Sequence, residues 1–290
     1  MAIGWVACAW MIAWNRFSWF QPFQPHTFPL LWFGYIVIIN AITYKRTGHC
    51  LMLDQPNFFG KLFLLSAGFW WVFEYLNQFV NNWHYTGIPI VDYWTSICSM
   101  TLSFSTVLPA VLGTRECLAS FPRLTAPFTK WHTTTVFESP HIGWLFFLIG
   151  SLGLGTIGLW PTVLFPLLWV SPLLIMVGLK MIWQEPTMFS SLTQGNWKPI
   201  VLPTLAALIC GGFWEMWNFY SLGHWEYTIP FVHTFEVFEM PLLGYAGYLP
   251  FGLECVAVVE IFLSVPKNEP WLGEHGLSPN HSPQLKGSLS

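Results

Sequence analysis

Charged side chains are scarce in this chain. Only 9% of its 290 residues are Asp, Glu, Lys or Arg, and the net charge is −3. A soluble domain carries about 25% charged residues. The Lys and Arg residues form no run, so the basic surface that a nucleic-acid-binding protein needs is missing. The sequence therefore predicts that neither nucleic acid nor another polyanion is a partner.

Motifs of several common catalytic chemistries are also missing. The chain has no Gly-rich phosphate loop, no Asp-rich diphosphate motif, no GxSxG and no Cys–His nucleophile arrangement, which weighs against hydrolysis, phosphoryl transfer and prenyl transfer. Its six Cys residues show no CxxC or CxxH spacing, and we interpret them as packing residues. We expect no cofactor, and the first residues lack the basic start of a removable signal peptide.

What the chain does have is apolar and aromatic sequence, with 54% hydrophobic residues and 19 Trp. Apolar runs near the length of a membrane span recur along it. They predict an all-α, polytopic transmembrane bundle of seven or eight spans, the first being the weakest because Asn15 and Arg16 interrupt it. The expected spans are 3–20, 28–44, 62–80, 94–113, 142–160, 162–180, 199–220 and 238–265.

The Lys and Arg residues predict how these spans are oriented, because short cytoplasmic loops retain positive charge. With a cytoplasmic N-terminus, Arg16 is the one basic residue among the 11 Lys and Arg that falls on the outer side. We therefore expect a multi-pass plasma (inner) membrane protein with both termini cytoplasmic. The 81–93 and 221–237 loops are then exoplasmic, and 266–290 is a disordered cytoplasmic tail.

Short motifs repeat in the same order, at offsets between 137 and 142 residues. They predict two four-helix repeats, 1–130 and 131–265, which have the same orientation because each holds an even number of spans. Any shared site would lie at their interface. The matches are FPLLW at 28–32 and 165–169, ExxN at 74–77 and 215–218, WxYT at 83–86 and 225–228, Leu-Pro at 108–109 and 249–250, and Glu-Cys at 116–117 and 254–255.

The two ExxN motifs place acids inside apolar spans. Glu74 and Asn77 lie on one helix face, as do Glu215 and Asn218. An ionised carboxylate in the membrane costs about 3 kcal/mol, so each acid must be paired, hydrated or protonated. We take both acids as candidate catalytic acids, oriented by the Asn residues. The alternative is that each Glu–Asn pair clamps helices together.

The last expected span contains two further acids, in FEMPLLGYAGYLPFGLEC at 238–255. Glu239 stands at its outer start and Glu254 more than halfway across, and both are candidate catalytic residues. The alternative for Glu254 is a salt bridge or hydrogen bond between the halves. Pro241 and Pro250 predict a kink in this span.

The outer loops hold the candidate substrate-binding residues. Trp83, Tyr85, Trp225 and Tyr227 have an alternative interpretation as part of an interfacial aromatic belt. The His and acidic residues of these loops fit neither HExxH nor a di-iron pattern, so no metal site is predicted. The candidate substrate-binding residues are Trp83, Tyr85, His224, Trp225 and Tyr227.

Two sets of residues resemble known families. FEYLN at 73–77 and FEMPLLGY at 238–245 resemble a bacterial family of polytopic membrane proteins, a resemblance that implies no activity. An acid at a helix end, then WxY, Pro and a second acid beside Pro, distantly resembles the heterodimer-type lycopene cyclases and carotenoid hydratases. Those cyclases carry Pro-x-Glu-Glu where this chain has Glu-Met-Pro. The matching residues are Glu74, Trp83, Tyr85 and Pro89, and then Glu215, Trp225, Tyr227, Pro230, Glu239 and Pro241.

The carotenoid-enzyme resemblance implies acid-initiated chemistry. A protonated Glu would add a proton to an isoprenoid double bond, and the cation would close a ring, take up water or lose a proton. Our leading hypothesis is a cofactor-independent enzyme that acts on a lipid or isoprenoid in the exoplasmic half of the bilayer. The alternatives are a transporter or proton relay between the repeats, and a non-catalytic membrane scaffold. The sequence predicts no oligomeric state.

Overall fold

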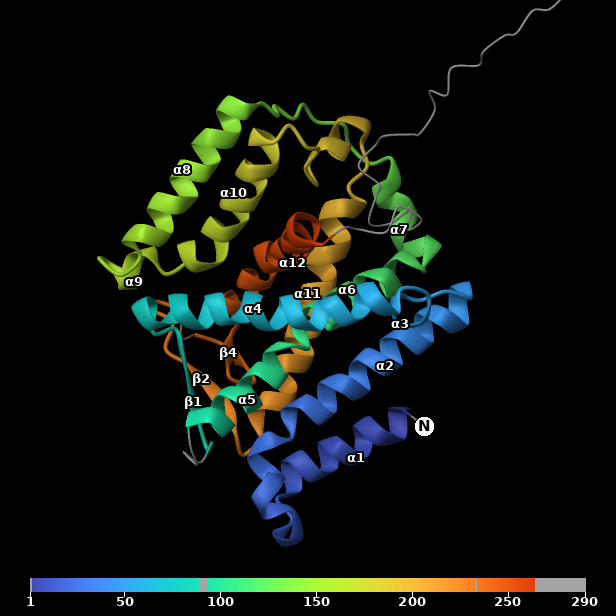
Figure 1. Cartoon of the computed structure of the whole chain (residues 1–290), viewed down its shortest axis with the longest axis vertical. Coiled ribbons are helices and arrows are strands. Elements are labelled where there is room, and N and C mark those ends of the chain that lie inside the picture. Colours follow the sequence, from blue (N-terminus) through green and yellow to red (C-terminus); the bar gives the residue numbers. More distant parts are fainter. Residues whose placement is uncertain (1, 89–92, 233, 264–290) are drawn as a thin grey trace, which may run out of the picture.

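The structure is a computed structural model that describes residues 2–88, 93–232 and 234–263 (Figure 1). It is mostly helical. The first half contains α1 (Ala2–Asn15), the 3₁₀ helix η1 (Ser18–His26), α2 (Phe28–Thr47), α3 (Leu51–Asp54), α4 (Pro56–Val80), strand β1 (Trp83–Thr86), α5 (Tyr93–Phe104), α6 (Val107–Ala119) and α7 (Pro122–Thr129). The second half contains α8 (Pro140–Thr156), α9 (Pro161–Leu164), α10 (Leu167–Ile182), η2 (Ser190–Gln194), α11 (Lys198–Phe219), β2 (His224–Tyr227), β3 (Glu236–Val237), β4 (Met240–Pro241), η3 (Leu242–Gly247) and α12 (Tyr248–Phe262).

Four helical segments of the described chain are long and apolar enough to cross a membrane, and three shorter apolar helices accompany them. The fold is therefore a helical one that suits a multi-pass membrane protein, as the composition predicts. The long segments are Phe28–Thr47, Tyr93–Ala119, Lys198–Phe219 and Leu242–Phe262, and the shorter ones are Ile3–Asn15, Pro140–Thr156 and Leu167–Ile182.

Local sequence explains where several helices begin and end. Pro occupies the first or second position of α2, α4, α8 and α11, where a missing N–H costs no intrahelical bond. α2 ends at Gly48, whose φ of 78° lets its N–H bind the carbonyl of Tyr44. Its last turn carries Lys45 and Arg46, which complement the negative helix end.

Several expected spans need correction. The first is too long at its end, because α1 stops at Asn15, where Arg16 takes a φ of 51° before η1. The span predicted over 94–113 lies within the long apolar segment Tyr93–Ala119, but this segment is interrupted between Phe104 and Val107 and so forms two helices, α5 and α6. Pro109 accounts for this break, since it has no N–H for the carbonyl four residues earlier. The spans at 28–44, 142–160 and 199–220 correspond to α2, α8 and α11.

The last expected span, 238–265, is also wrong at its start. α12 begins only at Tyr248, and Glu239 lies in a turn between β3 and β4. Pro250 is the third residue of α12 and, like Pro109 in α6, has no N–H for the carbonyl four residues earlier, which accounts for the change from the 3₁₀ helix η3 to the α-helix just before it. The predicted tail, 266–290, lies outside the described residues, as do Pro89 and His233.

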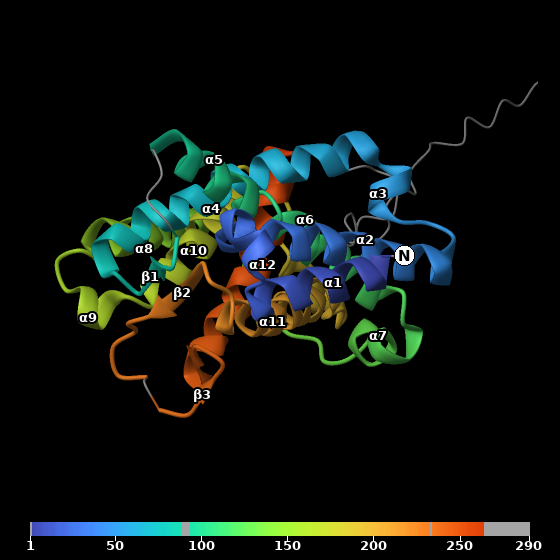
Figure 2. The same ribbon diagram turned by 90° about the horizontal axis from the view of Figure 1, so that it is seen from below.

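The helices gather around an aromatic core, whose largest fully buried side chains include Trp32, Phe73, Trp217 and Phe251. α8 and α10 form one antiparallel pair, and α11 and α12 run through the middle of the molecule (Figure 1). α3 and α7 lie at one end, and β1 and β2 at the other, which the turned view also shows (Figure 2).

The two WxYT motifs form β1 and β2, and they pair with each other in antiparallel register. Trp83 stands opposite Tyr227, His84 opposite Glu226, and Tyr85 opposite Trp225. β3 and β4 make a second short pairing. The all-α prediction misses all four strands of the described chain. The pairing of β1 with β2 places two segments side by side that are about 140 residues apart in the sequence.

Candidate functional site

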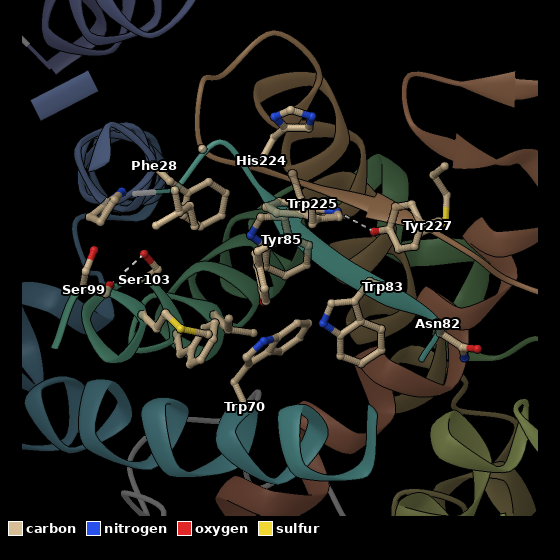
Figure 3. Close-up of a pocket in the computed structure, with 18 of the residues that line it drawn as sticks. Phe28, Trp70, Asn82, Trp83, Tyr85, Ser99, Ser103, His224, Trp225 and Tyr227 are labelled. Atoms are coloured by element: carbon tan, nitrogen blue, oxygen red, sulfur yellow. Dashed lines mark hydrogen bonds between the residues drawn. The ribbon is translucent and has the colours of Figure 1, made fainter. Parts of the chain in front are cut away.

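A cavity of about 150 Å³ lies beneath β1 and β2 (Figure 3). Its walls come from both halves of the chain. The first half supplies residues of η1, α2, α4, β1, α5 and α6, and the second half supplies residues of α10, α11, β2, β4, η3 and α12. Most of the lining is aromatic or apolar. The cavity is lined by all of the predicted substrate-binding residues, Trp83, Tyr85, His224, Trp225 and Tyr227.

Glu74 lies in α4 behind the aromatic wall of the cavity. Its Oε1 atom accepts hydrogen bonds from the indole Nε1 of Trp70 at 3.0 Å and of Trp83 at 3.1 Å. The hydroxyl of Tyr85 donates to the same oxygen at 2.6 Å. All three donors line the cavity, whereas Glu74 does not. The acid therefore fixes the orientation of rings that a ligand would touch.

Glu215 occupies the matching place in α11 and is fully buried. Its Oε1 atom accepts hydrogen bonds from the hydroxyls of Tyr227 at 2.8 Å and Tyr248 at 2.6 Å. Trp225 donates from Nε1 to the Tyr227 hydroxyl at 2.8 Å, which extends the chain of hydrogen bonds. Oε2 has no hydrogen-bond partner among the described residues. Again the donors line the cavity and the acid stands behind them.

Burial raises the pKa of the Tyr227 hydroxyl well above its usual value, and the neighbouring carboxyl of Glu215 raises it further. Burial and the carboxyl of Glu74 do the same to the pKa of Tyr85. Both phenols therefore remain protonated at neutral pH and act as hydrogen-bond donors.

The two acid clusters differ in their third aromatic residue. At the repeat offset of 141, Trp70 corresponds to Gly211 and Val107 to Tyr248. A Cβ atom on Gly211 would lie 2.5 Å from the Tyr248 ring. The ring of Tyr248 thus approaches Glu215 through space that a side chain at 211 would fill. Glu74 takes its corresponding donor from its own helix, and Glu215 takes it from α12.

We expect Gly211→Ala to displace the Tyr248 ring and weaken its bond to Glu215. Overpacking of this kind costs about 1–3 kcal/mol of unfolding free energy. Gly212→Ala is the matched control, since nothing lies within 4 Å of its added Cβ. Thermal inactivation of the purified variants in detergent measures the difference. Equal midpoints for both variants would contradict the prediction.

Asn77 and Asn218 bind the backbone of the strands that follow them. Asn77 donates to the carbonyl of Trp83 at 2.8 Å and accepts from the N–H of Asn82 at 2.8 Å. Asn218 donates to the carbonyl of Trp225 at 2.6 Å and accepts from its N–H at 2.8 Å. Each Asn therefore holds the strand whose aromatic residues reach the acid, so any orienting effect on Glu74 or Glu215 passes through β1 or β2.

The structure places the two remaining candidate acids outside the cavity wall. Glu254 is fully buried in α12, and neither of its carboxyl oxygens has a hydrogen-bond partner among the described residues. Glu239 is partly buried in the turn between β3 and β4, near enough to Glu215 to interact electrostatically. Burial raises the pKa of Glu239. Glu239 thus lies within electrostatic reach of Glu215 but makes no hydrogen bond to it, and Glu254 is a buried acid of α12 outside both acid clusters.

Among residues 2–88, 93–232 and 234–263, no group of three or more His, Cys, Asp or Glu side chains could hold a metal ion. His224 instead contacts Thr86 across the strand pair at 3.1 Å, and Glu226 at 3.3 Å. His233, another residue of the outer loop 221–237, falls outside the described residues.

Sequence reasoning missed several residues of the site. Trp70 was detectable, because it lies one helical turn before Glu74 on the same face. His26 and the serines of α5 that line the cavity were not singled out, although Ser96, Ser99 and Ser103 follow a helical spacing. Tyr248 carries no local signal, since its bond to Glu215 joins residues 33 positions apart.

Comparison with protein-family models, with curated proteins and with solved structures finds no match. The functional interpretation of this cavity therefore depends on its own geometry and chemistry.

Proposed function

We propose that this membrane protein binds an apolar, membrane-derived molecule of the lipid or isoprenoid class in the aromatic cavity and carries out acid–base chemistry on it without a cofactor. One observation carries the proposal. Two acids, the partly buried Glu74 and the fully buried Glu215, each anchor hydrogen-bonding aromatic residues that form the cavity wall. Intramembrane acids are costly, which favours a functional role for them.

Two repeats with a shared site fit this arrangement. The strand register supports them, because a two-fold rotation that exchanges the WxYT motifs turns the Trp83–Tyr227 pair into the Trp225–Tyr85 pair. It also exchanges His84 with Glu226, which stand opposite each other and would lie on the axis. The cavity under these strands is then the interface between the repeats.

A second reciprocal contact supports the same two-fold relation. Trp32, which ends the first FPLLW, packs against Trp214 with ring centroids 5.0 Å apart. Trp169, which ends the second FPLLW, packs against Phe73 at 5.3 Å. Phe73 directly precedes Glu74, and Trp214 directly precedes Glu215, so each repeat supplies a ring that supports the acid helix of the other.

The proposed site faces the outer side of the plasma membrane. Lys45 and Arg46 end α2, and Arg123 lies in α7, at the end of the molecule away from β1 and β2 (Figure 1). Because basic residues are retained on the cytoplasmic side of a membrane, this end of the molecule is the cytoplasmic end. The strands and the two acids then belong to the exoplasmic half.

The chemistry that we propose is a proton addition followed by a proton loss. Glu215 in its protonated form gives a proton to the Tyr227 hydroxyl, which turns its own proton away from Glu215 and passes it to one carbon of a substrate double bond, and the electron pair of the double bond forms the new C–H bond. The resulting cation, with or without ring closure, loses a proton from a neighbouring carbon to the Glu215 carboxylate through Tyr227, which restores the acid. No oxidant or reductant is needed, and the aromatic faces stabilise the cation.

Lipid extracts test this proposal. We expect a strain that expresses the protein to contain an isoprenoid or other lipid product that a deletion strain lacks. Glu215→Gln, which keeps the hydrogen-bond acceptor but not the acid, should lower that product at least about tenfold, within the usual range of general-acid effects. Glu185→Gln, at an exposed acid beyond α10, is the control and should leave it unchanged.

Chromatography with mass spectrometry compares the four extracts. Identical profiles with and without the protein would contradict the enzyme proposal and favour a transporter or scaffold. A product retained in full by Glu215→Gln would contradict the role of this acid.

A further inference from the structure

One end of the cavity is polar. His26, at the end of η1, shares a hydrogen bond between its Nδ1 and the Ser99 hydroxyl at 2.8 Å. Ser103, one turn further along α5, also lines this end. Figure 3 places Ser99 and Ser103 on the opposite side of the cavity from Trp83 and Asn82. The lining thus changes along its length from an aromatic body to a group of hydroxyls and an imidazole.

The residues that line the cavity, all within the described part of the chain, include no Asp, Glu, Lys or Arg. Arg16, the basic residue nearest to η1 in the sequence, donates to the carbonyl of Tyr220 and is not part of the lining. A phosphate or carboxylate buried here would therefore lose its hydration with no fixed cation to compensate, which is strongly unfavourable.

We propose that the ligand of this cavity is a neutral amphiphile, with one hydroxyl or carbonyl group held by His26 and Ser99 and an apolar body of which the cavity encloses the part next to that group. This inference rests on the proposed function and specifies its substrate class. Ser99 and His26 together offer both a donor and an acceptor, which a hydroxyl can satisfy on both sides. The apolar body would lie against the rings anchored by Glu74 and Glu215.

Three probes with one isoprenoid tail test the inference: farnesol, farnesyl phosphate and the hydrocarbon farnesene. Binding to the purified protein in detergent is measured by quenching of tryptophan fluorescence, because Trp70, Trp83 and Trp225 line the cavity. We expect farnesol to bind at least about tenfold more tightly than either analogue. One or two net hydrogen bonds account for a factor of that size.

Ser99→Ala should weaken farnesol binding several-fold and leave farnesene binding unchanged. Ser105→Ala is the matched control, since Ser105 follows α5, bonds to the carbonyl of Leu102 and does not line the cavity. Farnesyl phosphate binding as tightly as farnesol would overturn the inference, as would equal binding of farnesol and farnesene in the unaltered protein. Binding of none of the three would overturn the proposed function as well, whereas equal binding of all three would leave it standing.

Discussion

Replacing Glu215 by Leu is expected to lower the free energy of unfolding by about 2–5 kcal/mol, because two hydroxyls lose their acceptor together. Tyr227 and Tyr248 both donate to Oε1 of this fully buried residue. A buried donor left without an acceptor costs about 1–3 kcal/mol. The Trp225 indole, which donates to the Tyr227 hydroxyl, would lose its support as well.

Glu215→Gln separates loss of the acceptor from loss of the acid. Its side-chain carbonyl can still receive both hydroxyls, so we expect a change of about 1 kcal/mol or less. Loss of folded protein after heating in detergent, followed by size-exclusion chromatography, compares the two variants. If the Leu variant is as stable as the Gln variant, the acid does not organise the cavity wall as described.

The second large effect is expected at Gly87, which follows β1. Its φ is +67°, and an added Cβ would lie 1.7 Å from the carbonyl oxygen of Leu222, which is backbone and cannot rotate away. Gly87→Ala should therefore separate the ends of β1 and β2 and cost about 3 kcal/mol or more, since strain and overpacking add. The aromatic residues of β1 and β2 would then lose their antiparallel register.

Gly48→Ala is the control for Gly87→Ala. Gly48 has a similar φ of +78°, but nothing lies within 4 Å of its added Cβ. Its substitution isolates the cost of the backbone conformation, about 1 kcal/mol. Comparing the two variants by the same heating experiment measures the clash at Leu222 by difference. Equal losses of stability in the two variants would show that the close contact between Gly87 and Leu222 does not contribute to the cost of the substitution.

The sequence was informative wherever one residue type broke an otherwise uniform pattern. Glu74 and Glu215 stood out because an acid in an apolar helix is rare, and both prove to anchor the cavity wall. The strand pairing that joins them was not predictable, since it depends on contacts between Trp83 and Tyr227, 144 positions apart by numbering. Local pattern does not report such non-local partners.

The start of α12 was misjudged for a related reason. No charged residue interrupts the sequence from Met240 to Leu253, which suggests one continuous span. However, Pro241 is extended, and Gly244 and Gly247 lie in a 3₁₀ helix, so the α-helix begins only at Tyr248. The same irregular stretch supplies Met240, Gly244 and Gly247 to the cavity lining. The departure from a regular helix is therefore part of the site.

Trp70 corresponds to Gly211, and as a result the hydrogen bonds of Glu74 and Glu215 depend on different helices. Glu74 receives the Trp70 indole from α4 itself, so this bond moves with the helix that carries the acid. Glu215 accepts its hydrogen bond from the Tyr248 hydroxyl of a different helix, α12. The 3₁₀ helix η3, which lines the cavity, directly precedes α12. A displacement of α12 along α11 would thus change one hydrogen bond to Glu215 and none of the three that Glu74 accepts.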